Sequence, residues 1–213
     1  MVDAMDTQVA RALNPFTGKR IVTLIMAGTV LALVAWMWGE RIGSHLLPLY
    51  QWGFQQMAPY YQIQSLRIER AGSEPKYTVQ VQTTGLRYIE GMAVPRGYTL
   101  TSSTLVAHSL QPAMVLYLLL LIWPVTDWRH KARLLALSIP ILALIALVDV
   151  PLVLLGALED VLLSNLAPEN VRTSFPVQWM HLMNGGGRLA LSVAGFGLVV
   201  FLGALQKREI IAR

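Results

Sequence analysis

The sequence predicts a mainly helical membrane protein, with four transmembrane helices and a small antiparallel β insert on the outer side between the first and second helices. Hydrophobic residues make up 54% of the 213 residues and charged residues only 14%, where soluble proteins have roughly 25% charged residues. The apolar residues gather in four stretches, at 21–38, 105–125, 134–158 and 189–205. Each stretch is long enough, or nearly so, to cross a hydrocarbon core of about 30 Å.

The charges beside these stretches predict the orientation of the chain. Basic residues gather in the tail 1–20, in the short loop 126–133 and in the tail 206–213, whereas the loop 159–188 begins with acidic residues. By the positive-inside rule, both tails and the loop 126–133 are cytoplasmic, and the insert 39–104 and the loop 159–188 lie outside. We therefore expect a multi-pass protein of a bacterial-type inner (plasma) membrane. The same topogenic charges account for the net charge of +5, so we expect no nucleic-acid partner.

The first stretch, 21–38, is predicted to be an uncleaved signal anchor, because its 18 apolar residues exceed the usual length of a signal-peptide core and no small residues follow at cleavage spacing. The next segment, 40–62, is rich in aromatic residues: Tyr50, Trp52, Phe54, Tyr60 and Tyr61. Amphipathic rings settle at the level of the lipid headgroups. This composition predicts a helix lying at the outer membrane interface.

An alternating pattern then predicts a β-sheet over 63–101. Leu66 and Ile68 alternate with charged residues, and Tyr77, Val79 and Val81 alternate with polar ones. The cluster 71–75 between them has turn composition, so the two segments form a hairpin with one half-buried face. Segments 86–89 and 98–101 are expected to be the third and fourth strands. The insert has few apolar residues, so we expect it to lean on the outer loop, the bilayer surface or a partner.

The second, third and fourth stretches complete the predicted membrane domain. Hydroxyl residues at 102–104 come just before the second stretch and are suited to cap its helix. In the last stretch, Ala190, Ala194 and Gly197 form a stripe of small residues, which favours close packing inside the protein over dimerisation. The glycines 185–187 precede this stretch and read as a hinge or a close packing point, because a phosphate-binding loop would need a following Lys-Ser/Thr and a preceding strand.

Polar residues within the stretches define the candidate site. Asp149 lies in the middle of the third stretch, where an acidic residue costs about 2.5–3.5 kcal/mol on insertion scales. His108, Gln111 and Arg188 fall at a similar depth, so we predict an intramembrane polar cluster of His108, Gln111, Asp149 and Arg188, joined by His181. Three interpretations stay open: a clamp between helices in which Asp149 pairs with Arg188 or His108, a functional pocket, and a residue facing water or a headgroup defect.

We identify no catalytic, cofactor or metal signature in the sequence. The candidate catalytic residues are His181, His108, Asp149 and Ser103. The chain has no cysteine, and its histidines lack the spacing of a metal site. Haem ligation by His108 and His181 is an alternative. A serine hydrolase based on Ser102 or Ser103 lacks the usual GxSxG turn. We therefore expect no cofactor and no metal.

The second half of the chain resembles the layout of exosortases and archaeosortases, which are membrane transpeptidases that process sorting tails on surface proteins. Three features match. Ser102 and Ser103 lie at the outer end of a span, and His181 precedes the final span. Between them, the basic segment 128–133 begins a Leu-rich span that is interrupted by Pro140, Asp149 and Pro151. The family's cysteine nucleophile is missing, and Asp149 stands where an arginine is expected. Only His181 carries over, so the resemblance implies an exosortase-associated accessory protein.

These observations together predict a non-enzymatic accessory or assembly subunit of a membrane system that processes or exports envelope or surface proteins. Its partners are expected to be the lipid bilayer and a larger membrane protein, contacted through the outer β insert. One alternative is a membrane-embedded enzyme of exosortase-like layout that uses His181, His108 and Asp149 at the outer leaflet. Another is a small transporter or proton-path component built on Asp149.

Overall fold

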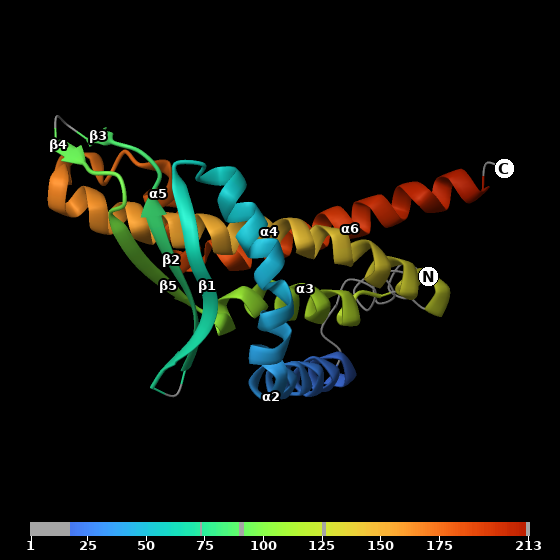
Figure 1. Cartoon of the computed structure of the whole chain (residues 1–213). Coiled ribbons are helices and arrows are strands. Elements are labelled where there is room, and N and C mark those ends of the chain that lie inside the picture. Colours follow the sequence, from blue (N-terminus) through green and yellow to red (C-terminus); the bar gives the residue numbers. More distant parts are fainter. Residues whose placement is uncertain (1–17, 73, 90–91, 125–126, 212–213) are drawn as a thin grey trace, which may run out of the picture.

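The computed structural model describes residues 18–72, 74–89, 92–124 and 127–211. Figure 1 shows an elongated arrangement with a small sheet at one end and a group of helices that extends to the other. The elements, in chain order, are α2 (Gly18–Met57), β1 (Tyr61–Ala71), β2 (Glu74–Thr83), β3 (Arg87–Ile89), β4 (Met92–Val94), β5 (Thr99–Leu105), α3 (Val106–Ile122), α4 (Trp128–Leu166), η1 (Pro168–Asn170), α5 (Phe175–Leu182), η2 (Met183–Gly187) and α6 (Arg188–Ile211). The predicted tail 1–20 falls largely outside the described residues.

Helix α2 joins two elements that the sequence predicts separately, the span 21–38 and the interfacial helix 40–62. It is a single 40-residue helix, and Figure 1 shows its teal second half running in a different direction from its blue first half. The first half packs antiparallel to α3, because a side chain added at Gly28 would meet Leu118 and one added at Gly39 would meet Leu110. The second half runs across α4, where Gly53 approaches Leu147.

The sheet confirms the predicted hairpin. Strands β1 and β2 pair antiparallel, with Leu66 opposite Val79 and Ile68 opposite Tyr77, and β5 completes a three-stranded sheet in the order β1-β2-β5. The predicted third strand lies elsewhere: β3 pairs with β4 in a separate two-stranded ribbon. The buried face of β2 consists of Tyr77, Val79 and Val81, as the alternation predicts.

Strand β5 corrects the prediction that hydroxyl residues cap the following helix. Ser102, Ser103 and Thr104 all belong to β5. Leu105 occupies the N-cap position of α3, and among the described residues no side-chain hydrogen bond caps the start of that helix. Ser102 instead points into the protein and donates a 2.9 Å hydrogen bond to the carbonyl oxygen of Leu154, which ties the sheet to α4.

Among the residues that the structure describes, three helical segments are long and apolar enough to cross a membrane, by length and composition: Ile21–Met57, Trp128–Leu166 and Phe175–Leu205. The second predicted span, 105–125, is shorter in the structure, because β5 takes its first residue and α3 ends at Ile122. The 17 residues of α3 cover about 26 Å, slightly less than a typical hydrocarbon core. Helix α4, with 39 residues, is about 58 Å long and must extend well beyond any bilayer that it crosses.

The two halves of α4 belong to two different apolar cores. Its first half contributes to the bundle core, a cluster formed by Leu116, Leu120, Leu134, Ile141, Ile145 and Val199. Its second half contributes to the sheet-side core, where residues of α4 from Val150 to Leu162 pack against the sheet and the second half of α2. The end of the predicted span 134–158 therefore packs against protein, and the insert leans on α4 and α2. A third, small cluster joins α5 to Val153.

The predicted outer loop 159–188 is mostly helical. It contains the end of α4, the short helices η1 and α5, and the π-helical turn η2, and Gly186 allows the bend from α5 into α6 with its positive φ of 112°. The predicted small-residue stripe of α6 faces outward: Ala190, Ala194 and Gly197 are all exposed. The close contact inside the bundle is made by a different glycine, Gly195, against Leu116 and Ile145.

Candidate functional site: a buried polar junction

A group of buried polar side chains lies where the bundle core meets the sheet-side core. We call it the polar junction and define it as Tyr50, Tyr77, Ser109, Asp149 and Arg188. Asp149 stands on α4 between Ile145 of the bundle core and Val150 of the sheet-side core. Five elements thus meet at the junction, namely α2, β2, α3, α4 and α6. Polar groups buried at this depth require partners, because each unpaired one costs stability.

The centre of the junction is an ion pair between Asp149 and Arg188. Arg188 Nε donates a hydrogen bond to Asp149 Oδ2 at 2.8 Å, and the two side chains are only 2% and 1% exposed. Arg188 Nη1 also donates to Asn184 Oδ1 at 3.1 Å and to the Met183 carbonyl oxygen at 3.4 Å. The bend at Gly186 places Asn184 beside the arginine, so the glycine-rich turn helps to hold the guanidinium in position.

The junction retains unused hydrogen-bonding capacity. Asp149 Oδ1 and Arg188 Nη2 are buried and have no hydrogen-bond partner among the residues that the structure describes. The charge of Asp149 also acts on the Tyr50 hydroxyl, so the Tyr50 phenol and the ion pair belong to one electrostatic environment. Leaving a buried polar atom unpaired costs about 1–3 kcal/mol. The ion pair therefore connects the helices, although not all of its hydrogen-bonding groups have a partner among the described residues.

Two tyrosines and a serine form the sheet side of the junction. The rings of Tyr50 and Tyr77 meet edge to face, with centroids 5.1 Å apart. The Tyr77 hydroxyl lies 3.3 Å from Ser109 Oγ, which itself donates to the Val106 carbonyl oxygen at 2.7 Å. Burial raises the pKa of the Tyr77 hydroxyl, so this group stays neutral at ordinary pH. Tyr77 and Ser109 together attach β2 to the first turn of α3.

The structure brings together some of the candidate residues and separates others. Arg188 and Asp149 are paired, and His108 is half-buried at a place where both of their charges act on it. Gln111 is exposed on α3 and takes no part in the junction. His181 is exposed on α5, and Ser103 is exposed on the outer face of the sheet. No hydrogen bond or ion pair of the described residues joins Ser103 or His181 to Asp149.

The sequence does not reveal the buried positions of two residues: Glu159, which lies outside the polar junction, and Tyr50, which belongs to it. Glu159 is buried, accepts a 2.6 Å hydrogen bond from Ser174 Oγ and a 3.1 Å hydrogen bond from Tyr60 Oη, and so links α4, the start of α5 and the approach to β1. The predicted role of Tyr50 as a ring at the membrane interface also differs from the structure, where this side chain is fully buried. The partners of Glu159 and of Tyr50 lie at distant positions in the sequence, so the sequence does not reveal these contacts. Ser174 is recognisable only as a helix cap, because it precedes Phe175-Pro176.

The described residues contain no group of three or more histidines, aspartates or glutamates that is placed to hold a metal ion. The junction itself offers a buried ion pair with no net charge, with two phenols and a hydroxyl beside it. Such a group suits the joining of elements. A nucleophile and a base within hydrogen-bonding reach of each other, which covalent catalysis requires, are not assembled from Ser103, His181 and Asp149.

Comparison with known proteins gives no relative: no protein-family model, no curated protein and no solved structure matches this chain. The resemblance to exosortases consequently rests on the layout of the sequence.

Proposed function

We propose that this chain is an integral protein of a bacterial-type inner membrane that crosses the bilayer with the first half of α2, with α3, with the first half of α4 and with α6. Its two ends lie in the cytoplasm, and its sheet lies outside. We further propose that it acts as a non-enzymatic accessory or assembly subunit of a system that processes or exports envelope or surface proteins.

The observation that carries the membrane assignment is the apolar surface of α2. Ile25 and Met26 are 61% and 64% exposed, and other large apolar side chains of the same half of the helix are exposed as well: Ile21, Val22, Val30, Leu33, Trp36 and Met37. Helix α6 adds exposed Val193, Leu198 and Phe201. Soluble monomers rarely expose contiguous apolar patches of this kind, whereas lipid tails would cover them.

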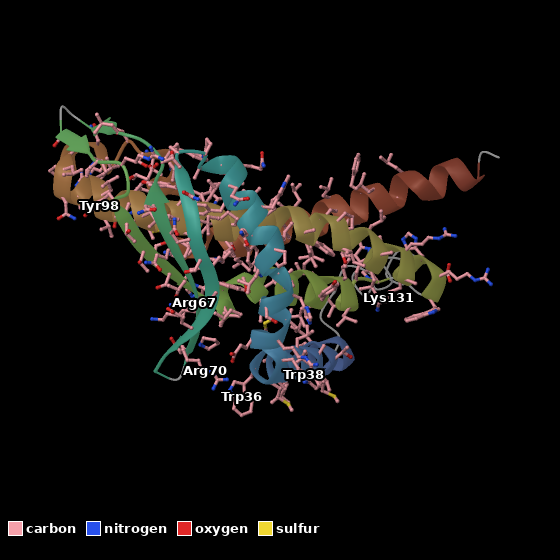
Figure 2. All side chains as sticks on the ribbon, viewed as in Figure 1. Trp36, Trp38, Arg67, Arg70, Tyr98 and Lys131 are labelled. Carbon is pink, nitrogen blue, oxygen red and sulfur yellow. The ribbon has the colours of Figure 1, made fainter. Side chains whose placement is uncertain are left out.

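Tryptophans at two levels support the placement of the bilayer. Trp36 and Trp38 are exposed near the bend of α2, and Trp123 and Trp128 are exposed at the other end of the bundle. Tryptophan is enriched at both membrane interfaces. At the second level, Lys131 Nζ donates a 2.9 Å hydrogen bond to the carbonyl oxygen of Leu121 at the end of α3, and Figure 2 places this lysine far from the sheet. The basic residues beside it favour the cytoplasmic side.

The state of the candidate catalytic groups favours an accessory role over an enzyme. Asp149 is buried and held by Arg188, so it is not presented to a substrate. Ser103 and His181 are exposed on different elements, β5 and α5. A proton path through Asp149 is also disfavoured, because the paired arginine neutralises the carboxylate and opposes the approach of another cation.

Strand β1 is the surface that we propose for the partner. It is an edge strand of the sheet, and its register shifts between Ile63 and Ser65. A bulge on an edge strand discourages indiscriminate strand pairing, so we expect contact through exposed side chains such as Gln62 and Arg67. The aromatic segment 40–62 contributes little to this contact, since Tyr50 and most of its other rings are buried and Trp52 is the exposed exception at 54%.

Photo-crosslinking in native membranes tests this function. A photoreactive residue at Gln62 or Arg67 should yield one predominant adduct with a larger membrane protein, and the same residue at Arg129 on the proposed cytoplasmic end should not yield that adduct. Equal adducts from all three positions, or none from β1, would contradict the proposed contact. Peptide-bond cleavage or transfer by the purified chain, abolished by His181→Ala, would establish the enzymatic alternative instead.

A further inference from the structure

A groove of about 460 Å³ lies between α2 and β1, outside the polar junction. Three polar side chains of α2 line it: Glu40, Arg41 and Ser44. Its remaining walls are apolar and consist of Met37, Trp38, Leu47 and Ile68. Met37, Arg41 and Ser44 follow the i, i+4, i+7 spacing and therefore share one face of the helix. A groove that combines one polar wall with apolar walls suits an amphipathic ligand.

The charge balance of the groove leaves one cation in excess. Arg70 of β1 crosses to α2 and pairs with Glu40, with 2.6 Å between Nη2 and Oε2. Arg67, which precedes Arg70 on β1, pairs with Glu69. Arg41 is exposed and forms no ion pair among the residues that the structure describes. Since the Glu40 carboxylate is already engaged, the guanidinium of Arg41 is available for an anion from outside the chain.

The position of the groove selects the kind of anion. The apolar run of α2 ends at Trp38, and Trp36 beside it is 84% exposed. Figure 2 shows Trp36, Trp38 and Arg70 gathered at one corner of the molecule, where Arg70 of β1 pairs with Glu40 of α2. On the proposed membrane placement, this corner lies at the level of the outer headgroups, where the phosphodiesters of phospholipids are the abundant anions.

We propose that this groove binds one phospholipid of the outer leaflet. Arg41 binds the phosphodiester, because the planar guanidinium donates two parallel hydrogen bonds to phosphate oxygens. Met37, Trp38 and Ile68 cover the glycerol and the upper acyl chains. Ser44 donates its hydrogen to the Arg41 carbonyl oxygen at 2.7 Å, so its oxygen accepts a hydrogen bond from the headgroup. A free phosphate would leave the apolar walls uncovered, which is why the lipid is the favoured source of the anion.

The inference rests on the membrane placement proposed above, and its test separates the two. The full chain is purified from membranes in mild detergent, and binding of phosphatidylglycerol is measured by native mass spectrometry. We expect the unaltered chain to retain one lipid and Arg41→Gln to lose about tenfold in affinity, which corresponds to about 1.4 kcal/mol. Arg96→Gln is the matched control, because Arg96 is an exposed arginine in a turn remote in sequence from the groove residues.

A second variant tests the charge balance without altering Arg41. Arg70→Gln releases Glu40, whose carboxylate then competes for Arg41, so lipid affinity should fall while the circular dichroism spectrum stays unchanged. Inorganic phosphate at millimolar concentration should not displace the lipid. Equal affinities of Arg41→Gln and Arg96→Gln, or displacement by phosphate, would overturn the lipid site. A chain recovered in the soluble fraction would overturn the membrane placement, which is a separate outcome.

Discussion

The ion pair between Asp149 and Arg188 should contribute to stability as a unit, and substitutions of either residue or of both test this. Asp149→Leu leaves the guanidinium of Arg188 buried without a counter-charge, and an arginine cannot neutralise itself by losing its proton. Arg188→Met leaves Asp149 unpaired, but a buried carboxyl can take up a proton. The double variant removes both charges. The expected order of destabilisation is therefore Asp149→Leu, then Arg188→Met, then the double variant.

The structure sets the magnitude of each change. Breaking a buried ion pair by removing one partner costs about 3–5 kcal/mol, and both side chains are almost fully buried, so we expect a loss in this range for Asp149→Leu. Asp149→Asn retains an acceptor for Arg188 Nε and should cost less, by about 1.5–3 kcal/mol, the value of a hydrogen bond to a charged group. The double variant should lie within about 1 kcal/mol of the unaltered chain.

Equilibrium unfolding in mixed detergent micelles measures these differences, with the fluorescence of the six tryptophans as the signal. A double-mutant cycle then gives the interaction energy of the pair. An ordinary hydrogen bond between membrane helices contributes only about 0.6 kcal/mol on average, so a coupling of several kcal/mol identifies the buried charge as the cause. Additive losses in the double variant, or an Asp149→Leu variant as stable as the unaltered chain, would refute the reasoning.

Two further predictions concern close packing and the attachment of the sheet. Gly156→Ala should lose about 1–3 kcal/mol in the same unfolding assay, because its new methyl group would collide with the backbone of α5. Gly197→Ala, whose added carbon meets open space, should be neutral, and equal losses from both would argue against the described packing of α4 on α5. Ser102→Ala should lose about 1 kcal/mol with its hydrogen bond to Leu154, whereas exposed Ser103→Ala should change little, and the reverse order would contradict the inward orientation of Ser102.

The hairpin could be predicted because its alternation is visible in residue type. The start of strand β5 matches the predicted strand 98–101, but its continuation to Leu105 could not be predicted, because the buried positions after Leu100 are Ser102 and Thr104, so the alternation appears in burial and not in polarity. Hydroxyl residues there suit a helix cap as well as a strand, and the hydrogen bond from Ser102 to α4 that distinguishes the two involves a residue 52 positions away.

Composition also cannot separate a protein core from a lipid environment. The second half of α4 is as rich in leucine as its first half, yet Leu154 and Leu158 pack in the sheet-side core. Within the predicted polar cluster, the depth of each residue in the membrane, taken from its position along its helix, was sufficient to place Asp149 near Arg188. It was not sufficient for Gln111, because the rotation of α3 that turns this side chain outward depends on its tertiary contacts.

Labelling of single cysteines tests the membrane placement most directly, because the chain has no cysteine of its own. Ser103→Cys places a thiol on the exposed face of the sheet, and Arg129→Cys places one on the exposed start of α4. In intact spheroplasts, a membrane-impermeant maleimide should label Ser103→Cys alone, and Arg129→Cys should react only after permeabilisation. Labelling of Arg129→Cys without permeabilisation, or protection of Ser103→Cys until that step, would contradict the proposed topology.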